Sequence, residues 1–223
     1  MKYLFALFLV LFVCGCSSKV AVVKIANNEA LLSENGEVIT NAKYEMLFKF
    51  NDKFYKTLKN GKFGIIKVNA EEVLKPIYDS ISNEYNGHAI IELNGKFGLV
   101  DSNFDERIKP QYEYINDIND NFLIVKYKKV GCVDYDNNIL LDYKYDMIYP
   151  FHEGLARVEN GGKFGFIDES CQEVVKPIYD YAGDFYNGYA KIKLNDKYSF
   201  INRNTEKISE VDLDNVENFK GNY

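Results

Sequence analysis

The chain has 223 residues, and its 27 lysines and arginines are outnumbered by 33 aspartates and glutamates, which gives a net charge of -6. This balance argues against nucleic acid as a partner, because binding to phosphates requires clustered cationic side chains. The hydrophobic content of 47% excludes a wholly disordered chain. There are 18 tyrosines and 16 phenylalanines but no tryptophan. Because aromatic residues favour strands, the composition indicates an all-β fold.

The first residues are typical of an export signal. A short positive start is followed by the apolar run Tyr3–Val13. This run is too short to span a bilayer as a helix, but it suits the hydrophobic core of a signal peptide. The residues at its end, Val13-Cys14-Gly15-Cys16, resemble the bacterial lipobox, in which a small residue precedes the cysteine that receives diacylglycerol.

We predict that Cys16 is the lipidated residue. Gly15 is the small residue that the lipobox requires, and Val13 is the branched apolar residue two positions earlier. Cys14 fits poorly, because Val13 would then occupy the place of the small residue. A plain secretory signal cleaved nearby is the alternative. The predicted boundaries are a signal peptide over 1–15 and a lipidated tether over 16–19, with acyl chains holding the protein at a membrane without a spanning helix.

The predicted location is the bacterial cell envelope. Ser17, rather than an aspartate, follows Cys16. In enterobacterial lipoproteins this resemblance implies transfer to the outer membrane, so the outer membrane is favoured over the inner membrane.

One unit of 34 residues is repeated six times after the tether. The segment Lys62-Phe63-Gly64 recurs around positions 98, 131 and 165, and degenerate copies lie around positions 30 and 199. These anchor positions are spaced by 34, 34, 33, 34 and 34 residues. The short spacing comes from a missing residue between Tyr112 and Phe122. A second marker, Pro-x-Tyr-Asp or a variant, keeps the same step, and a fixed period of this kind defines a repeat architecture.

Each copy is predicted to be β-structure. Residues 190–194 alternate between apolar side chains and lysines, which is the pattern of a half-buried strand. Turns such as Asn60-Gly61 favour a type I′ hairpin, because both central residues need a positive φ. A third short strand, such as Glu173–Val175, is expected to stop at Pro177. The Tyr-Asp pair that follows is interpreted as an outward turn into a loop before the next copy.

We therefore predict an all-β domain over residues 20–223, made of six β-meander repeats and beginning with a strand at Val20–Ile25. One repeat cannot bury its own apolar face, so stability has to come from stacking on neighbouring copies. Two arrangements fit this pattern, a curved open β-solenoid and a closed six-bladed propeller. The open array is favoured because 34 residues are few beside the ~40–45 of a four-stranded propeller blade.

The combined markers resemble the bacterial WG (KWG) repeat. The segments Gly162–Asp168, Val175–Asp180 and Gly188–Ala190 carry the resemblance, which spans nearly the whole chain after the tether. Phenylalanine stands in place of the name-giving tryptophan at positions 63, 97 and 164. The resemblance implies a repeat scaffold that is often exported and that has no family-wide catalytic residues.

Aspartates recur at one repeat position, at Asp101, Asp134 and Asp168. Recurrence favours a structural role, such as accepting backbone N–H bonds in a turn, over the single asymmetric site of an enzyme. Asp134-x-Asp136-x-Asn138 also has the oxygen spacing of a calcium loop, but Ile139 replaces the glycine expected at the sixth place. Neither a catalytic residue, nor a cofactor, nor a metal site is predicted.

The histidines and the remaining cysteines give weak signals. His88 and His152 occupy different repeat positions without an evident nucleophile partner, so they are interpreted as surface or loop residues. Cys132 stands where another copy has leucine, and it is interpreted as a small buried hydrophobe. An oxidising compartment permits a bridge to Cys171. Because the two cysteines lie at different places in their repeats, the sequence leaves this pairing open.

The predicted function is a non-enzymatic interaction or scaffold module at the membrane surface, with an envelope or surface protein as its partner. The recurring tyrosines at 44, 78, 112, 145 and 179 are expected to be core residues rather than a binding surface. Positions that differ among the copies, such as the loop Tyr112–Phe122 with Asp117 and Asp120, are the predicted contact surface.

Two other functions fit the same sequence. One is an envelope glycan-binding or glycan-hydrolysing enzyme, which would need a pair of carboxylates facing one cleft. The other is a structural envelope component that needs no specific ligand.

Overall fold

A computed structural model describes residues 20–117 and 122–208 of the chain. Within these ranges the chain forms 21 β-strands and no helix, which confirms the predicted all-β class. The described residues accordingly contain no helix long and apolar enough to cross a membrane.

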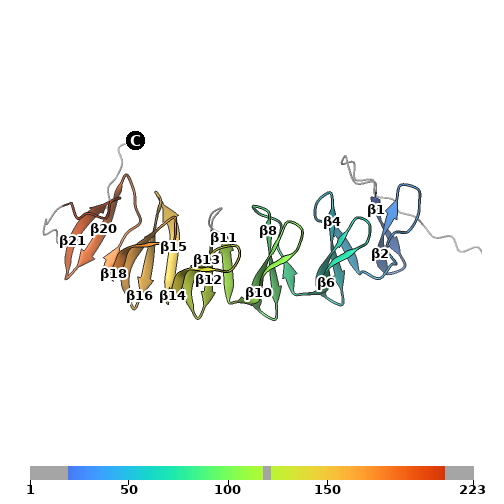
Figure 1. The fold of residues 1–223 in the computed structure, drawn as a ribbon, viewed down its shortest axis with the longest axis horizontal. Coiled ribbons are helices and arrows are strands. Elements are labelled where there is room, and N and C mark those ends of the chain that lie inside the picture. The colour runs from blue at the N-terminus through green and yellow to red at the C-terminus, as the bar shows by residue number, and fades with distance from the viewer. Residues whose placement is uncertain (1–19, 118–121, 209–223) are drawn as a thin grey trace, which may run out of the picture. The chain divides into compact units, whose positions relative to one another are not determined.

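The strands form six antiparallel sheets, and each sheet is a meander of strands that are consecutive in the sequence (Figure 1). Sheet one consists of β1 (Val20–Ile25) and β2 (Asn28–Ser33). Sheet two consists of β3 (Met46–Lys49), β4 (Phe54–Lys59), β5 (Lys62–Lys67) and β6 (Glu72–Tyr78). Sheet three consists of β7 (Ser80–Ile81), β8 (His88–Leu93), β9 (Lys96–Asp101) and β10 (Glu106–Tyr112).

The remaining sheets follow the same plan. Sheet four consists of β11 (Tyr114–Asp117), β12 (Leu123–Tyr127), β13 (Lys129–Val133) and β14 (Ile139–Tyr145). Sheet five consists of β15 (Met147–His152), β16 (Leu155–Asn160), β17 (Lys163–Asp168) and β18 (Glu173–Tyr179). Sheet six consists of β19 (Tyr181–Ala182), β20 (Tyr189–Leu194) and β21 (Lys197–Asn202). Each sheet contains one of the six anchor positions, which confirms the repeated β-meander.

Sheets two to five have four strands, not the predicted three. The prediction that the strand of sheet five stops at Pro177 was wrong, because β18 continues through this proline to Tyr179. Proline is tolerated there because β18 lies at the edge of its sheet, where a missing N–H does not break a ladder on both sides. The outward loop was also wrong. Only Asp180 separates β18 from β19, which is the first strand of the next sheet.

The anchor glycine is required by the close approach of the fourth strand. A Cβ atom on Gly98 would lie 2.4 Å from the carbonyl oxygen of Ile108 and 2.7 Å from the nitrogen of Pro110. The other three four-stranded sheets have the same crowding at the same position. Sheets one and six have Ala30 and Ser199 instead, and the residues described there form two and three strands. The anchor glycine is thus found in the sheets that have a fourth strand close to it.

The chain divides into two compact units, residues 1–111 and 112–223, and in each unit neighbouring sheets pack face to face. We call the side of a sheet that contacts the next sheet its front face, and the opposite side its back face. In the first unit, Leu31 and Tyr44 on the front face of sheet one pack against Leu47, Tyr55 and Ile66 on the back face of sheet two. Each such buried side chain contributes about 1.5–3 kcal/mol to stability.

The same pairing of faces recurs between the later sheets. In the first unit, the front face of sheet two contributes Ile65, Leu74 and Tyr78, and the back face of sheet three contributes Ile81, Ile91 and Val100. In the second unit, the front face of sheet four contributes Cys132, Leu141 and Tyr145, and the back face of sheet five contributes Ile148, Val158 and Ile167. The front face of sheet five contributes Leu155 and Phe166, and the back face of sheet six contributes Ala182, Ile192 and Ile201.

The recurring tyrosines are buried or half-buried, as predicted for core residues. Tyr44, Tyr78, Tyr112 and Tyr145 are buried, and Tyr179 is half-buried. Burial raises the pKa of the Tyr145 phenol, and its hydrogen bond to the Glu173 carboxylate raises that pKa further. Neutral phenols with an apolar ring and one satisfied hydroxyl are suited to the space between two sheets.

Cys132 and Cys171 form a disulfide, with their Cα atoms 6.5 Å apart. The bridge joins the front face of sheet four to the turn that follows β17 in sheet five. The same two repeat positions in the first unit are occupied by Ile65 and Phe104, which lie in one apolar cluster. The disulfide therefore replaces a hydrophobic contact between neighbouring sheets with a covalent bond.

A lysine–aspartate ion pair, which we call an ionic clip, connects each of several sheets to a turn of the next sheet. Between sheets two and three, the Asp79 carboxylate pairs with the Lys62 ammonium of sheet two and accepts the backbone N–H of Asn94 in sheet three at 2.6 Å. The equivalent contacts are Asp146 with Lys129 and the N–H of Gly161, and Asp180 with Lys163 and the N–H of Asn195. These bonds explain why lysine and aspartate recur 17 residues apart.

The clips predict an acid-sensitive component of stability. The lysine partner, and then the backbone N–H, lower the pKa of Asp79, Asp146 and Asp180. A lowered pKa in the folded state means that this stabilisation is present above the usual carboxyl range and is lost as the pH falls through the lowered pKa. We expect the urea midpoint to fall on acidification, and to fall less in a variant with all three aspartates replaced by asparagine.

Asp142→Asn is the matched control for this prediction, because Asp142 is exposed on β14 and takes no part in a clip. This variant should keep the acid dependence of the unchanged protein. If the triple variant has the same acid dependence as the control, the clips do not contribute.

Candidate functional site

The candidate site lies in sheet six and begins with a tight turn between β19 and β20. Asn187 and Gly188 have φ values of 51° and 85°, which places both in the left-handed region that asparagine and glycine tolerate. Tyr186 and Tyr189 close the turn with two backbone hydrogen bonds of 2.9 and 3.1 Å. Both tyrosine rings are exposed, at 57% and 38% of their possible surface. The turn therefore presents aromatic rings beside amide groups.

The second wall of the site is the turn after β21. The side-chain oxygen of Asn202 accepts the backbone N–H of Glu206 at 2.9 Å, and its amide group donates to the Glu206 carboxylate at 2.9 Å. The backbone N–H of Thr205 donates to the carbonyl of Asn202 at 2.8 Å. These bonds hold Arg203 and Asn204 at the tip of the turn.

Glu153 of sheet five joins the two turns. Its carboxylate accepts the backbone N–H of Gly188 at 2.8 Å and pairs with the Arg203 guanidinium at 2.9 Å. The N–H of Gly188, followed by Arg203, lowers the pKa of the Glu153 carboxyl group. The Glu153 carboxylate therefore balances the positive charge of Arg203 and holds the guanidinium in place as one wall of the site.

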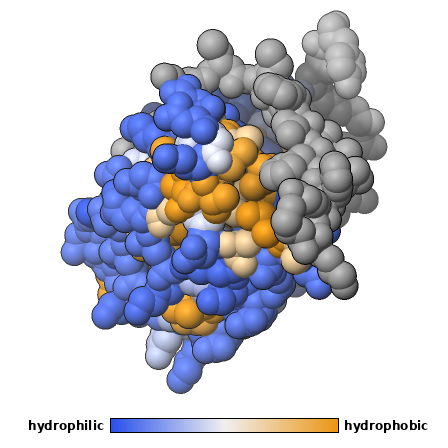
Figure 2. Space-filling view, turned by 90° about the vertical axis from the view of Figure 1, so that its right-hand side faces the viewer, coloured by the Kyte–Doolittle hydropathy of each residue, from blue (hydrophilic) through white to orange (hydrophobic). Residues whose placement is uncertain are grey.

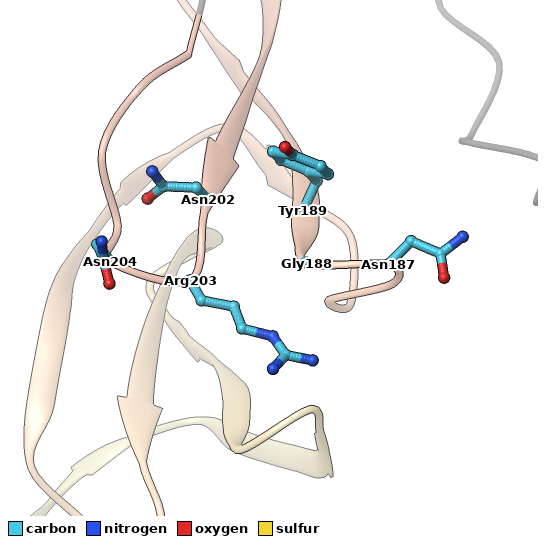
Figure 3. A pocket seen from close by; sticks show the side chains of 6 residues that line it. All are labelled: Asn187, Gly188, Tyr189, Asn202, Arg203 and Asn204. Carbon is cyan, nitrogen blue, oxygen red and sulfur yellow. The ribbon is translucent and has the colours of Figure 1, made fainter.

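Together the two turns enclose a shallow depression that is open to solvent (Figure 3). In Figure 3, Arg203 extends beneath Gly188, while Asn202 and Asn204 lie on the other side of the depression. The residues that line it are Asn187, Gly188, Tyr189, Asn202, Arg203 and Asn204. In Figure 3 the Asn187 side chain points away from the depression, and the Asn202 amide is hydrogen-bonded to Glu206. The exposed Tyr189 ring and the Asn204 amide suit a polar partner with some apolar surface, such as a loop of another protein.

The recurring aspartates close turns, as predicted. The Asp101 carboxylate accepts the backbone N–H groups of Asn103 and Asp105 at 2.9 and 3.0 Å. Asp168 accepts the equivalent two bonds in sheet five.

Asp134 makes the same turn in sheet four. One of its oxygens accepts the backbone N–H groups of Asp136 and Asn138, and the other accepts the side-chain amide of Asn138. The spacing that resembles a calcium loop is thus the spacing of a hydrogen-bonded turn. The described residues contain no group of three or more histidine, cysteine or acidic side chains arranged to hold a metal ion.

The histidines lie apart and have different surroundings. His88 lies in the turn before β8, where its Nδ1 atom is 2.9 Å from the carbonyl oxygen of Asn86. His152 lies at the end of β15, and its Nε2 atom is 3.9 Å from the Asp184 carboxylate. The structure does not bring either histidine into the depression of sheet six.

Two sequence predictions fall partly or wholly outside the described residues. Cys16, the predicted lipidation site, lies in the segment 1–19, and the predicted contact loop between Tyr112 and Phe122 includes residues 118–121. Sequence reasoning also missed the depression in sheet six. The turn at Asn187-Gly188 carries a readable signal, but Glu153 and Arg203 are 50 residues apart and give none.

A family model described as a WG containing repeat matches five consecutive segments, at residues 31–63, 63–97, 97–129, 131–164 and 164–198. These matches cover most of the chain. The chain belongs to the WG repeat family. The five matched segments correspond to the five intervals between the six anchor positions, so the family period and the period of the sheets agree.

Solved structures give more distant similarities. PorZ, a bacterial surface component of the type-IX secretion system of Porphyromonas gingivalis, is 12% identical, with a TM-score of 0.35 over 85% of this chain and 30% of that chain. The extracellular domain of a putative hybrid two-component system from B. thetaiotaomicron is 10% identical, with a TM-score of 0.34 over 88% of this chain and 35% of that one. The WG-repeat chain thus spans about a third of each. No curated protein sequence matches it.

Proposed function

We propose that this WG-repeat protein is an exported lipoprotein, anchored through Cys16, whose repeat domain binds a protein partner at the cell envelope without catalysing a reaction. The supporting observation is how the recurring residues are used. Glycines, aspartates, lysines and tyrosines that return in several copies are engaged in strand crossings, turns, clips and cores. Some exposed residues recur, such as Tyr85 and Tyr186, and others differ between copies, such as Tyr189. Repeat proteins bind partners through the exposed positions that differ.

The depression in sheet six is the proposed contact site. Tyr189 and Asn204 line it, and the same repeat positions in sheet three carry His88 and Asn103. Tyrosine is enriched at protein interfaces because its ring supplies apolar area and its hydroxyl a hydrogen bond. The site therefore differs from the equivalent place in another copy by the residue type that contributes most to interfaces.

Crosslinking in living cells, followed by affinity capture of the full-length protein, tests this proposal. We expect one envelope protein to be captured reproducibly, and the Tyr189→Ser, Asn204→Ala variant to lose most of the captured material. The matched control is His88→Ser, Asn103→Ala, which makes the same kind of change at the same repeat positions in sheet three and should leave capture unchanged.

Other results would replace the proposal. Capture of an envelope glycan that depends on Tyr189 would support the glycan-binding alternative. Equal loss of capture in both variants would show that the depression is not the contact site. Capture of no partner at all would favour a structural role in the envelope.

A further inference from the structure

Sheet one has an apolar face that no other sheet of the first unit covers. Its front face, which carries Val20, Val22 and Leu31, packs against sheet two. Ala21, Val23 and Ile25 alternate with these residues along β1 and therefore lie on the back face, where Val23 is buried, Ala21 is half-buried and Ile25 is exposed. Within each unit, the back face of every later sheet is covered by the front face of the sheet before it. Sheet one is the first described sheet of its unit, so no described sheet of that unit precedes it to cover its back face.

Two further residues extend this back face. Leu32 pairs directly with Ala21 across the β1–β2 ladder, and side chains of directly opposed residues lie on the same face. Val38 forms an isolated bridge with Leu32 and is 50% exposed, while Ile25 is 42% exposed. Figure 2 faces the end of the molecule at which β1 and β2 lie in Figure 1, and it shows hydrophobic residues gathered amid hydrophilic ones.

The length of the tether limits what can cover this face. If Cys16 is acylated, three residues separate the anchor from the first strand at Val20. A fully extended chain spans at most ~3.3–3.6 Å per residue, so sheet one lies within about 15 Å of the lipid-bearing cysteine. The apolar face is therefore held beside the bilayer, which is itself an apolar medium behind its headgroups.

We propose that the accessible part of the back face of sheet one, with Ala21, Ile25, Leu32 and Val38, lies against the membrane and inserts its side chains among the lipids. The inference depends on the lipid anchor of the proposed function. It adds a second, non-covalent contact, which fixes the orientation of sheet one at the surface. The acyl chains and this face together act as two membrane signals, and two signals give stable attachment.

Tryptophan fluorescence tests this contact, because the chain contains no tryptophan of its own. The mature acylated Val38→Trp protein is reconstituted in vesicles of phosphatidylethanolamine and phosphatidylglycerol. The matched control is Ile139→Trp, at the same repeat position in sheet four and 56% exposed. We expect the emission of the Val38→Trp protein to shift to shorter wavelength and to be quenched by lipids brominated on their acyl chains. The control should show neither effect.

Each other outcome overturns the inference in a recognisable way. If the acylated protein floats with the vesicles but neither tryptophan is quenched, the face is not in the membrane, and the lipid anchor stands. If the Val38→Trp emission shifts with protein concentration and without quenching, a second copy of the chain covers the face. If mass spectrometry of the same sample finds no acyl group and the protein does not float, the proposed anchor fails together with the inference.

Discussion

Replacement of Gly98 by alanine should lower the free energy of unfolding by about 3 kcal/mol or more. The added Cβ would meet the carbonyl oxygen of Ile108 at 2.4 Å and the nitrogen of Pro110 at 2.7 Å. Both obstacles are backbone atoms of β10, so no side chain can turn away to make room. Either β10 detaches from β9 or the ladder shifts, and both outcomes weaken sheet three. Urea denaturation followed by circular dichroism measures the loss.

Ser199→Ala is the control at the equivalent position of sheet six, where a side chain is already accommodated. It should cost no more than about 1 kcal/mol, the net value of one hydrogen bond. Equal losses in the two variants would contradict the explanation, because the crowding under the fourth strand would then have no particular effect.

Reduction of the disulfide should lower the free energy of unfolding by about 4 kcal/mol, the value expected for a bridge that closes a loop of this length. The bridge joins residues 39 apart in the sequence. It restricts the unfolded chain and fixes two neighbouring sheets against each other. Urea denaturation with and without reductant, together with mobility on non-reducing gels, measures the effect.

The Cys132→Ala, Cys171→Ala variant controls for direct effects of the reductant, and its urea midpoint should be the same in both conditions. A wild-type midpoint that reductant leaves unchanged, or equal mobility of oxidised and reduced protein, would contradict the bridge.

Much of the repeat could be predicted from local rules. Asn60-Gly61 was interpreted as a hairpin, and φ values of 52° and 71° confirm the required backbone. The recurring aspartates were assigned to turns because a short acidic side chain can accept nearby N–H groups, and Asp101 does so. Such features depend on residues close in the sequence, so their pattern is visible without a structure.

The fourth strand was missed because proline was interpreted by its usual effect. Pro177 lacks an N–H group, which usually ends a strand, yet an edge strand needs hydrogen bonds on one side only. The anchor glycine is the residue from which the fourth strand could be predicted. Its recurrence indicates that another backbone passes close by, which becomes clear only when strand and partner are considered together.

The disulfide and the candidate site could not be predicted without knowing how neighbouring copies pack against each other. Cys132 and Cys171 occupy different repeat positions, and they become neighbours because the front face of one sheet packs against the next sheet. Ile65 and Phe104 lie in one core cluster of the first unit at those same two positions. Glu153, Gly188 and Arg203 likewise come from two sheets and three turns. No periodic signal in one copy predicts such contacts.

Mass spectrometry of the mature N-terminus tests the central claim most directly, because the proposed location, the tether and the membrane contact of sheet one all depend on it. The account predicts a chain that begins at Cys16 and carries the mass of a diacylglyceryl group on that cysteine. An unmodified N-terminus, or a mature chain that begins at another residue, would contradict it.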